Sequence, residues 1–122
     1  MSLALRAGAR IVVTGAAARS FLHAELAGVR YLPFDGGGEL GESLRDTDMV
    51  VFVVDAGDAA MPHAAAVAAA ARDRGILVAA IVLSDTALHG RSPLLAALRE
   101  AADMVMIVRD SQAAHAVIAA LR

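Results

Sequence analysis

Apolar residues are concentrated in five short runs along the chain. Four of these runs are continuous and rich in β-branched residues, which is typical of strands buried on both faces of a parallel sheet. The run at 29–34 instead alternates and contains Pro33, which has no N–H to donate to a neighbouring strand, so it predicts an edge strand. The predicted strands are Arg10–Thr14, Val29–Phe34, Asp48–Val54, Leu77–Leu83 and Asp103–Val108.

Helical patterns, several of them rich in alanine, fill the segments between the runs. Pro62 and Pro93 stand where the first turn of a helix accommodates proline, and Gly75 stands where a helix ends. Asp110 or Ser111 is the expected N-cap of the last helix. The predicted helices are Ala16–Leu26, Glu39–Arg45, Pro62–Asp73, Pro93–Ala102 and Ser111–Leu121.

This alternation of strands and helices predicts an α/β fold. Crossover helices place consecutive strands in a parallel sheet, and the edge character of the second run favours the strand order 2-1-3-4-5. The expected architecture is a three-layer, open, five-stranded sheet that resembles Rossmann and flavodoxin folds. The length of 122 residues predicts a single domain over residues 1–122. The D-M-V openings at Asp48 and Asp103 are interpreted as two parallel strand starts rather than a duplication.

Composition excludes several classes of function. Hydrophobic residues make up 58% of the chain, but no apolar run approaches the roughly 20 residues of a membrane span. A cytoplasmic protein without membrane contact is expected. Cysteine is absent, which excludes disulfides and thiolate nucleophiles. A net charge of -2 and 3% aromatic residues argue against nucleic-acid binding. All 11 basic residues are arginines, which excludes Schiff-base lysines and the P-loop lysine.

The expected ligand site lies at the carboxyl ends of the strands. In open parallel sheets, ligands bind outside these ends where the strand order reverses, here between the first and third strands. The turn after the first strand and the Asp-Ala-Gly-Asp segment after the third should line the crevice. The candidate ligand-binding residues are Gly15, Ala16, Ala17, Arg19, Asp35, Gly36, Gly37, Asp55, Gly57, Asp58 and Ser84.

Two features of this edge have alternative interpretations. Asp35, Asp55 and Asp85 could hold a cation such as Mg²⁺, but carboxylates at these positions also cap helices, which is the simpler explanation, so no metal is assigned. The glycines at 36–38 could bind a phosphate or form a flexible loop, and the loop is favoured. No nucleophile is paired with a base, so no catalytic residue is assigned. A small enzyme that uses Asp55 or Asp85 as acid or base stays an open alternative, and a protein without catalysis is favoured.

Several segments resemble the nucleotide-binding domain of the tubulin/FtsZ family. They are I-V-V-T-G-A-A-A-R-S-F (Ile11–Phe21), G-V-R-Y-L-P-F-D (Gly28–Asp35), T-D-M-V-V-F-V-V-D-A-G (Thr47–Gly57) and L-R-E-A-A-D-M-V-M-I-V-R-D (Leu98–Asp110). That family binds GTP, but this chain departs from the family pattern, so the resemblance implies weak binding of GTP or another nucleotide, or none. The family's G-G-G-T-G-[ST]-G loop corresponds to the segment Gly57–His63, which has lost most of its glycines. Tubulin-like GTP hydrolysis and filament formation are therefore not expected.

The chain also resembles response-regulator receiver domains. Asp55 and Ser84 stand at the ends of the third and fourth strands as in that family, whereas Arg109 replaces its lysine and Thr14-Gly15 its acidic pair. This resemblance implies a module that binds partners without phosphorylation. Two hypotheses follow: a Rossmann-like module that binds a nucleotide or another phosphate compound, and a non-catalytic protein-interaction module that forms a homo-oligomer through apolar surface.

Overall fold

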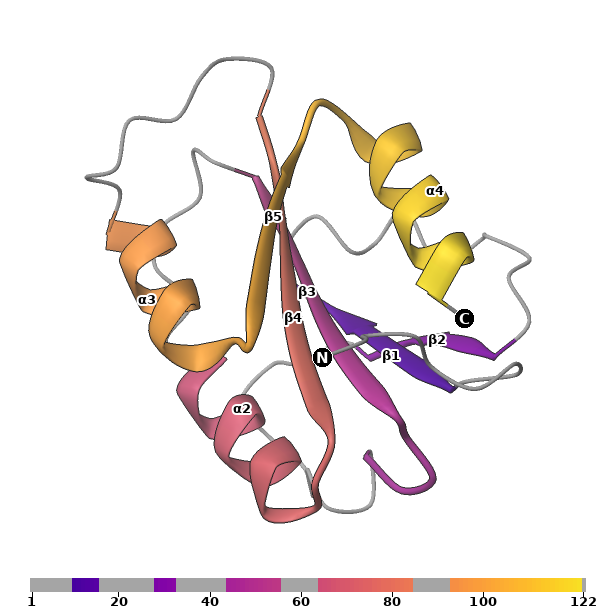
Figure 1. Ribbon diagram of the computed structural model, residues 1–122, viewed down its shortest axis with the longest axis vertical. Coiled ribbons are helices and arrows are strands. Elements are labelled where there is room, and N and C mark those ends of the chain that lie inside the picture. The colour runs from indigo at the N-terminus through magenta and orange to yellow at the C-terminus, as the bar shows by residue number, and fades with distance from the viewer. Residues whose placement is uncertain (1–9, 16–27, 33–43, 56–63, 85–92, 122) are drawn as a thin grey trace.

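The computed structural model describes residues 10–15, 28–32, 44–55, 64–84 and 93–121. These residues form one sheet of five parallel strands in the order β2-β1-β3-β4-β5, which confirms the predicted fold class and strand order (Figure 1). The strands are β1 (Ile11–Thr14), β2 (Val29–Tyr31), β3 (Met49–Asp55), β4 (Leu77–Leu83) and β5 (Met104–Val108). The helices are α2 (Ala64–Asp73), α3 (Pro93–Ala101) and α4 (Ser111–Leu121).

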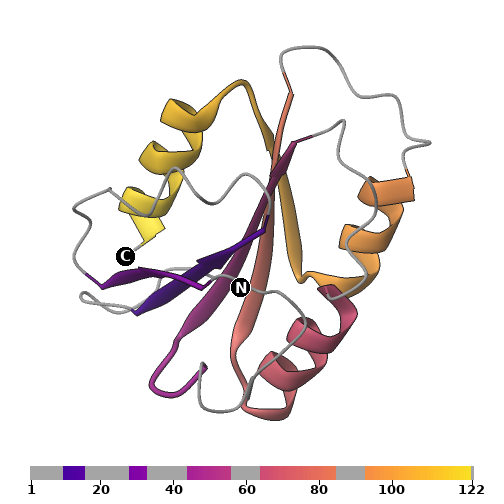
Figure 2. The ribbon, with the colours of Figure 1, turned by 180° about the vertical axis from the view of Figure 1, so that it is seen from behind.

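Helices lie on both faces of the sheet, as Figure 1 and the view from behind in Figure 2 show. Helices α2 and α3 cover one face and α4 covers the other. Alternate side chains of β3 enter the two cores: Phe52 packs on the α2 and α3 side, and Val51 packs on the α4 side. Because both faces are covered, Met49 to Val54 are all buried, which explains the continuous apolar run.

Both D-M-V segments open a strand through the same pair of hydrogen bonds. The Asp48 N–H donates to the Arg10 carbonyl at 2.8 Å, and the Arg10 N–H donates to Asp48 Oδ2 at 2.8 Å. The Asp103 N–H donates to the Val78 carbonyl at 2.8 Å, and the Val78 N–H donates to Asp103 Oδ2 at 3.0 Å. Each carboxylate thus completes the ladder where a strand begins, as expected for two strand starts.

Local chemistry also sets the helix ends. After α2, the Gly75 N–H donates to the Arg72 carbonyl at 3.0 Å and the Ile76 N–H to the Ala71 carbonyl at 2.9 Å. This is a Schellman motif with Gly75 at a φ of 69°, which confirms the predicted stop. The Ala113 N–H donates to Asp110 Oδ1 at 2.8 Å, so Asp110 is the N-cap of α4.

Most element bounds agree with the predictions to within one or two residues. The ranges of β4 and α4 are those predicted, and α3 ends at Ala101, one residue early. The predicted helix Ala16–Leu26 lies outside the described residues, as do Pro33 and Phe34 of the second run. Leu44 and Arg45, at the end of the predicted helix Glu39–Arg45, lie in a turn, and the rest of that helix is outside. No helix in the described segments is long and apolar enough to cross a membrane.

Candidate functional site

The strand order reverses between β1 and β3, which makes their carboxyl ends the expected ligand site. The two strands end at different levels. Thr14, the last residue of β1, lies opposite Phe52, whereas β3 continues to Asp55. At about 3.3 Å per residue, β3 extends roughly 10 Å beyond the end of β1. The sheet edge therefore has a step here, with Thr14 and Gly15 at its base.

Gly15 lies directly against the backbone of β3. Its φ is 117°, and a Cβ built on it would lie 2.5 Å from the Val53 carbonyl oxygen. No side chain fits at that distance, so the turn after β1 requires glycine. Gly15 was predicted to line the ligand crevice, and the structure shows that the backbone of β3 lies directly against it.

Thr14 is a polar residue buried at the same point. Its side chain is fully buried, and Oγ1 has no hydrogen-bond partner in the described structure. A buried hydroxyl without a partner costs about 1–3 kcal/mol of stability. Such exceptions in a folded protein call for an explanation, such as a bound water, an ion or a ligand. Thr14 was not among the predicted site residues, although a single polar residue that ends an apolar strand at the switch point is a usable signal.

Two further candidates lie at the ends of the next strands. Asp55 ends β3 with an exposed side chain, opposite Leu83 of β4. Ser84 follows β4, is half-buried, and its N–H donates to the Val108 carbonyl at 2.8 Å. Gly15, Asp55 and Ser84 therefore share the carboxyl edge. The other candidates lie outside the described residues: Ala16, Ala17, Arg19, Asp35, Gly36, Gly37, Gly57 and Asp58.

The aspartates at this edge had two interpretations. For Asp110, which follows β5, the bond from the Ala113 N–H supports helix capping. Asp35 and Asp85 lie outside the described residues. Among the residues that are described, no group of three or more histidine or acidic side chains could hold a metal ion.

A cavity that the sequence did not predict lies at the opposite, amino edge of the sheet. It has a volume of about 400 Å³ and is lined by three arginines, Arg10, Arg30 and Arg45, together with Ile11, Val12, Gly28, Val29, Asp46 and Thr47. Its walls come from three segments that only strand pairing brings together.

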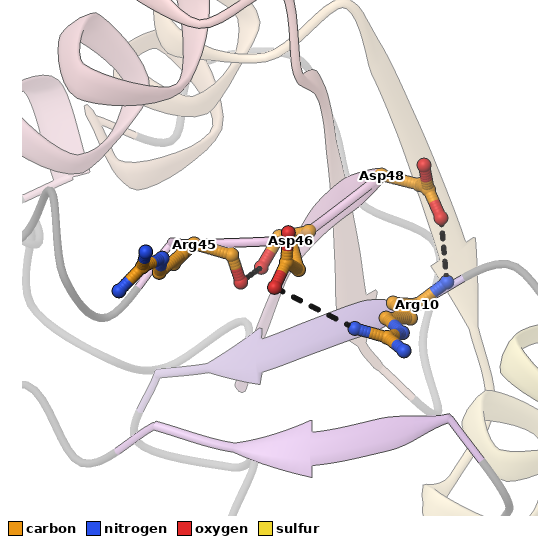
Figure 3. A network of polar contacts seen from close by, with 5 residues as sticks. Arg10, Arg45, Asp46 and Asp48 are labelled. Atoms are coloured by element: carbon orange, nitrogen blue, oxygen red, sulfur yellow. Dashed lines mark hydrogen bonds and ion pairs between the residues drawn. The ribbon is translucent and has the colours of Figure 1, made fainter.

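The charged groups of this cavity are open to solvent. Arg10 Nη1 lies 3.8 Å from Asp46 Oδ2, and these side chains are 66% and 73% exposed. Figure 3 shows Asp46 turned toward Arg10, with the Arg45 guanidinium directed away from both. Solvent and salt screen such a pair, so it contributes little to stability. The cavity is a basic depression without a buried polar group to orient a ligand.

Comparisons of the chain with protein-family models, with curated proteins and with solved structures find no match. The resemblances to tubulin/FtsZ and receiver domains therefore stay predictions.

Proposed function

We propose that the chain is a small-molecule-binding module that takes a nucleotide or another phosphate compound at the carboxyl ends of β1 and β3. The observation that carries the proposal is the buried, unpartnered hydroxyl of Thr14 at the base of the step, next to Gly15. A ligand oxygen, or a water that the ligand orders, would supply the missing partner. Evolution tolerates an unsatisfied group of this kind where it serves a function.

The chemical class of the ligand comes from the resemblance to the tubulin/FtsZ family, which implies GTP or another nucleotide. Asp55 at the rim would repel a phosphate, so we expect a divalent cation to accompany the ligand. Tubulin-like hydrolysis is not part of the proposal, because the segment Gly57–His63 lacks most of the glycines of the family's phosphate-binding loop.

The alternative is a non-catalytic interaction or homo-oligomerisation module. One observation favours it: Ile107, in the edge strand β5, is 48% exposed. This alternative is compatible with ligand binding, because it uses a different edge of the sheet.

A thermal-shift titration of the whole chain with nucleotides and inorganic phosphate, with and without Mg²⁺, tests the ligand proposal. A ligand at about 100 times its Kd stabilises the fold by about 2.7 kcal/mol. At roughly 4 °C per kcal/mol for a domain of this size, the melting temperature should rise by about 10 °C.

Thr14→Val identifies the site. Valine has nearly the same shape and removes the unsatisfied hydroxyl, so the free protein should gain about 1 kcal/mol, or about 4 °C. The same variant should lose most of the ligand-induced shift. Thr14→Ser, which keeps the hydroxyl and loses a methyl group, should be less stable but retain the shift.

Arg10→Ala is the matched control at the amino-edge cavity. It should retain the shift, because its side chain is exposed and lies at the other edge. Loss of the shift in Arg10→Ala with retention in Thr14→Val would move the site to the amino edge and overturn the proposal. So would a flat response of the wild-type chain to every phosphate compound.

A further inference from the structure

The outer edge of β5 is the most open apolar feature of the described structure. β5 is the last strand of the sheet, so one side of its backbone pairs with no described strand. Its sequence, M-V-M-I-V, contains no charge and no proline, and all of its side chains are partly or largely exposed. Edge strands are normally kept from pairing by charges, prolines or short length. The opposite edge, β2, follows this rule with three residues and Arg30 at its centre.

We propose that β5 pairs with β5 of a second copy of this chain, antiparallel, about a two-fold axis at Met106. The two sheets then form one continuous sheet across the axis. This inference specifies the surface for the oligomerisation alternative and does not rest on the ligand proposal.

Backbone directions limit the registers that such a pair can adopt. The Ser84 N–H donates to the Val108 carbonyl at 2.8 Å, so the backbone of Val108 faces β4. Because the direction alternates along a strand, Met106 also faces β4, and Val105 and Ile107 present N–H and C=O to the open edge. A two-fold pair must place outward residues opposite outward residues. Its axis can therefore pass through a residue but not between two residues, and the axes that keep at least three residues of β5 paired with β5 of the second copy, and lie nearest its centre, pass through residue 105, 106 or 107.

Side-chain chemistry selects the axis at Met106. That register pairs all five residues of β5, with Val105 opposite Ile107 of the second copy. The Asp103 N–H faces β4 and adds no bond to the new ladder, but the register brings the exposed Asp103 at one end of β5 to the same end as Arg109 of the second copy. An axis at 105 would place Asp103 opposite an isoleucine, and an axis at 107 would place Arg109 opposite a valine. Only the middle register matches apolar with apolar residues and opposite charges with each other, which are the favourable cross-strand pairs.

The groups needed for this register are available. Arg109 is exposed and has no hydrogen bond or ion pair with any described residue. Asp103 is exposed and uses Oδ2 to accept from the Val78 N–H, which leaves Oδ1 for a guanidinium. Val105 and Ile107 lie in register with Ala80 and Val82, whose side chains face α2 and α3. The cross-strand pairs would therefore cover the exposed Ile107.

The first test is the molar mass of the ligand-free chain, measured by sedimentation velocity over a wide range of concentrations. The mass should rise from 12.5 kDa toward twice that value. Ile107→Glu and Arg109→Asp should each weaken the dimer at least tenfold, whereas Ile107→Leu and Arg109→Lys should leave it intact. A monomer at every concentration, or a dimer that neither disruptive variant affects, would overturn the proposal.

The second test determines the register. The chain has no cysteine, so a single introduced thiol reports one position. In the proposed register, Met106 lies opposite its own copy in a non-hydrogen-bonded pair, with Cα atoms about 4.5 Å apart, which suits a disulfide. Under mild oxidation, Met106→Cys should form a covalent dimer, whereas Val105→Cys and Ile107→Cys should not do so alone and should do so when mixed.

A disulfide in Ile107→Cys alone, with none in Met106→Cys, would contradict the axis at Met106. Circular dichroism of each variant before oxidation shows whether it retains the helix and strand content of the wild type. The mixed pair of Val105→Cys and Ile107→Cys keeps Met106 intact, so the register remains testable even if Met106→Cys fails to fold.

Discussion

At the scale of single residues, Gly15 and Gly75 show that one residue type can meet two different requirements. Both have a positive φ, 117° for Gly15 and 69° for Gly75. A Cβ on Gly75 would have no heavy atom within 4 Å, whereas a Cβ on Gly15 would lie 2.5 Å from the Val53 carbonyl oxygen. Glycine is needed at position 75 only because of the backbone conformation. At position 15 it is needed for the backbone conformation and also because β3 occupies the space that a methyl group would fill.

Alanine substitution at the two glycines should separate these requirements. Gly75→Ala should cost about 1 kcal/mol, because the left-handed strain of 1–2 kcal/mol is partly offset by lower entropy of the unfolded chain. Gly15→Ala should cost about 3 kcal/mol or more, because the strands must also move apart. Urea denaturation of both variants measures the difference. Equal losses of stability would show that Gly15 does not contact β3 as described.

The same residues show what sequence reasoning can reach. A glycine after an apolar strand predicts a turn, and Gly15 was found in this way. The contact with Val53, however, depends on the pairing of β1 with β3, which no local pattern contains. The missing partner of Thr14 has the same origin, because it follows from the packing around the end of β1. Local signals therefore predicted a candidate site, and tertiary contacts determined which of its described atoms are unusual.

At the scale of elements, the strand openings depend on Asp48 and Asp103. Each carboxylate accepts a hydrogen bond from a backbone N–H at the start of a neighbouring strand: Arg10, just before β1, donates to Asp48, and Val78, the second residue of β4, donates to Asp103. An aspartate before a buried strand is common, and its presence in the sequence does not reveal which neighbouring strand will donate a hydrogen bond to its carboxylate. The periodicity of the apolar runs predicted the strands themselves well, because both faces of β3 and β4 are buried.

Substitution at Asp48 tests this role of the carboxylate. Asp48→Ala should lower the free energy of unfolding by about 1–2 kcal/mol, since a hydrogen bond to a charged acceptor is lost and the Arg10 N–H loses this partner. Asp48→Asn should lose less, because its amide oxygen can still accept. Urea denaturation gives both values. The control is Asp46→Asn, which removes the exposed pair with Arg10 and keeps a residue type that tolerates the φ of 56° at this position, so little change is expected. An effect of Asp48→Ala no larger than that of Asp46→Asn would contradict this assignment.

The amino-edge cavity marks the limit of prediction at this scale. Its arginines come from segments near residues 10, 30 and 45, which β1 and its neighbours bring together. The sequence shows each arginine beside a strand but does not show that the three converge. Rules about parallel sheets directed attention to the carboxyl edge, so this depression was not predicted.

At the scale of the whole molecule, the two proposals use different parts of one sheet. The proposed ligand site lies where β1 and β3 end, and the proposed dimer forms along the outer side of β5. From β1 to β5 there are three strand spacings of about 4.8 Å, which place the two regions roughly 14 Å apart. Effects of substitutions at that separation, without shared partners, usually add.

Ile107→Glu and Thr14→Val should therefore each affect only one of the two properties, dimerisation or ligand binding. Ile107→Glu should be monomeric and retain the ligand-induced thermal shift, because its charge disrupts only the β5 pair. Thr14→Val should lose that shift and keep the concentration-dependent mass of the wild-type chain. Sedimentation and thermal shift on both proteins complete the comparison. If the ligand-induced thermal shift disappears in Ile107→Glu, ligand binding requires the dimer. Linkage between two binding equilibria is reciprocal. The ligand should then tighten the wild-type dimer by the same factor by which dimerisation tightens ligand binding.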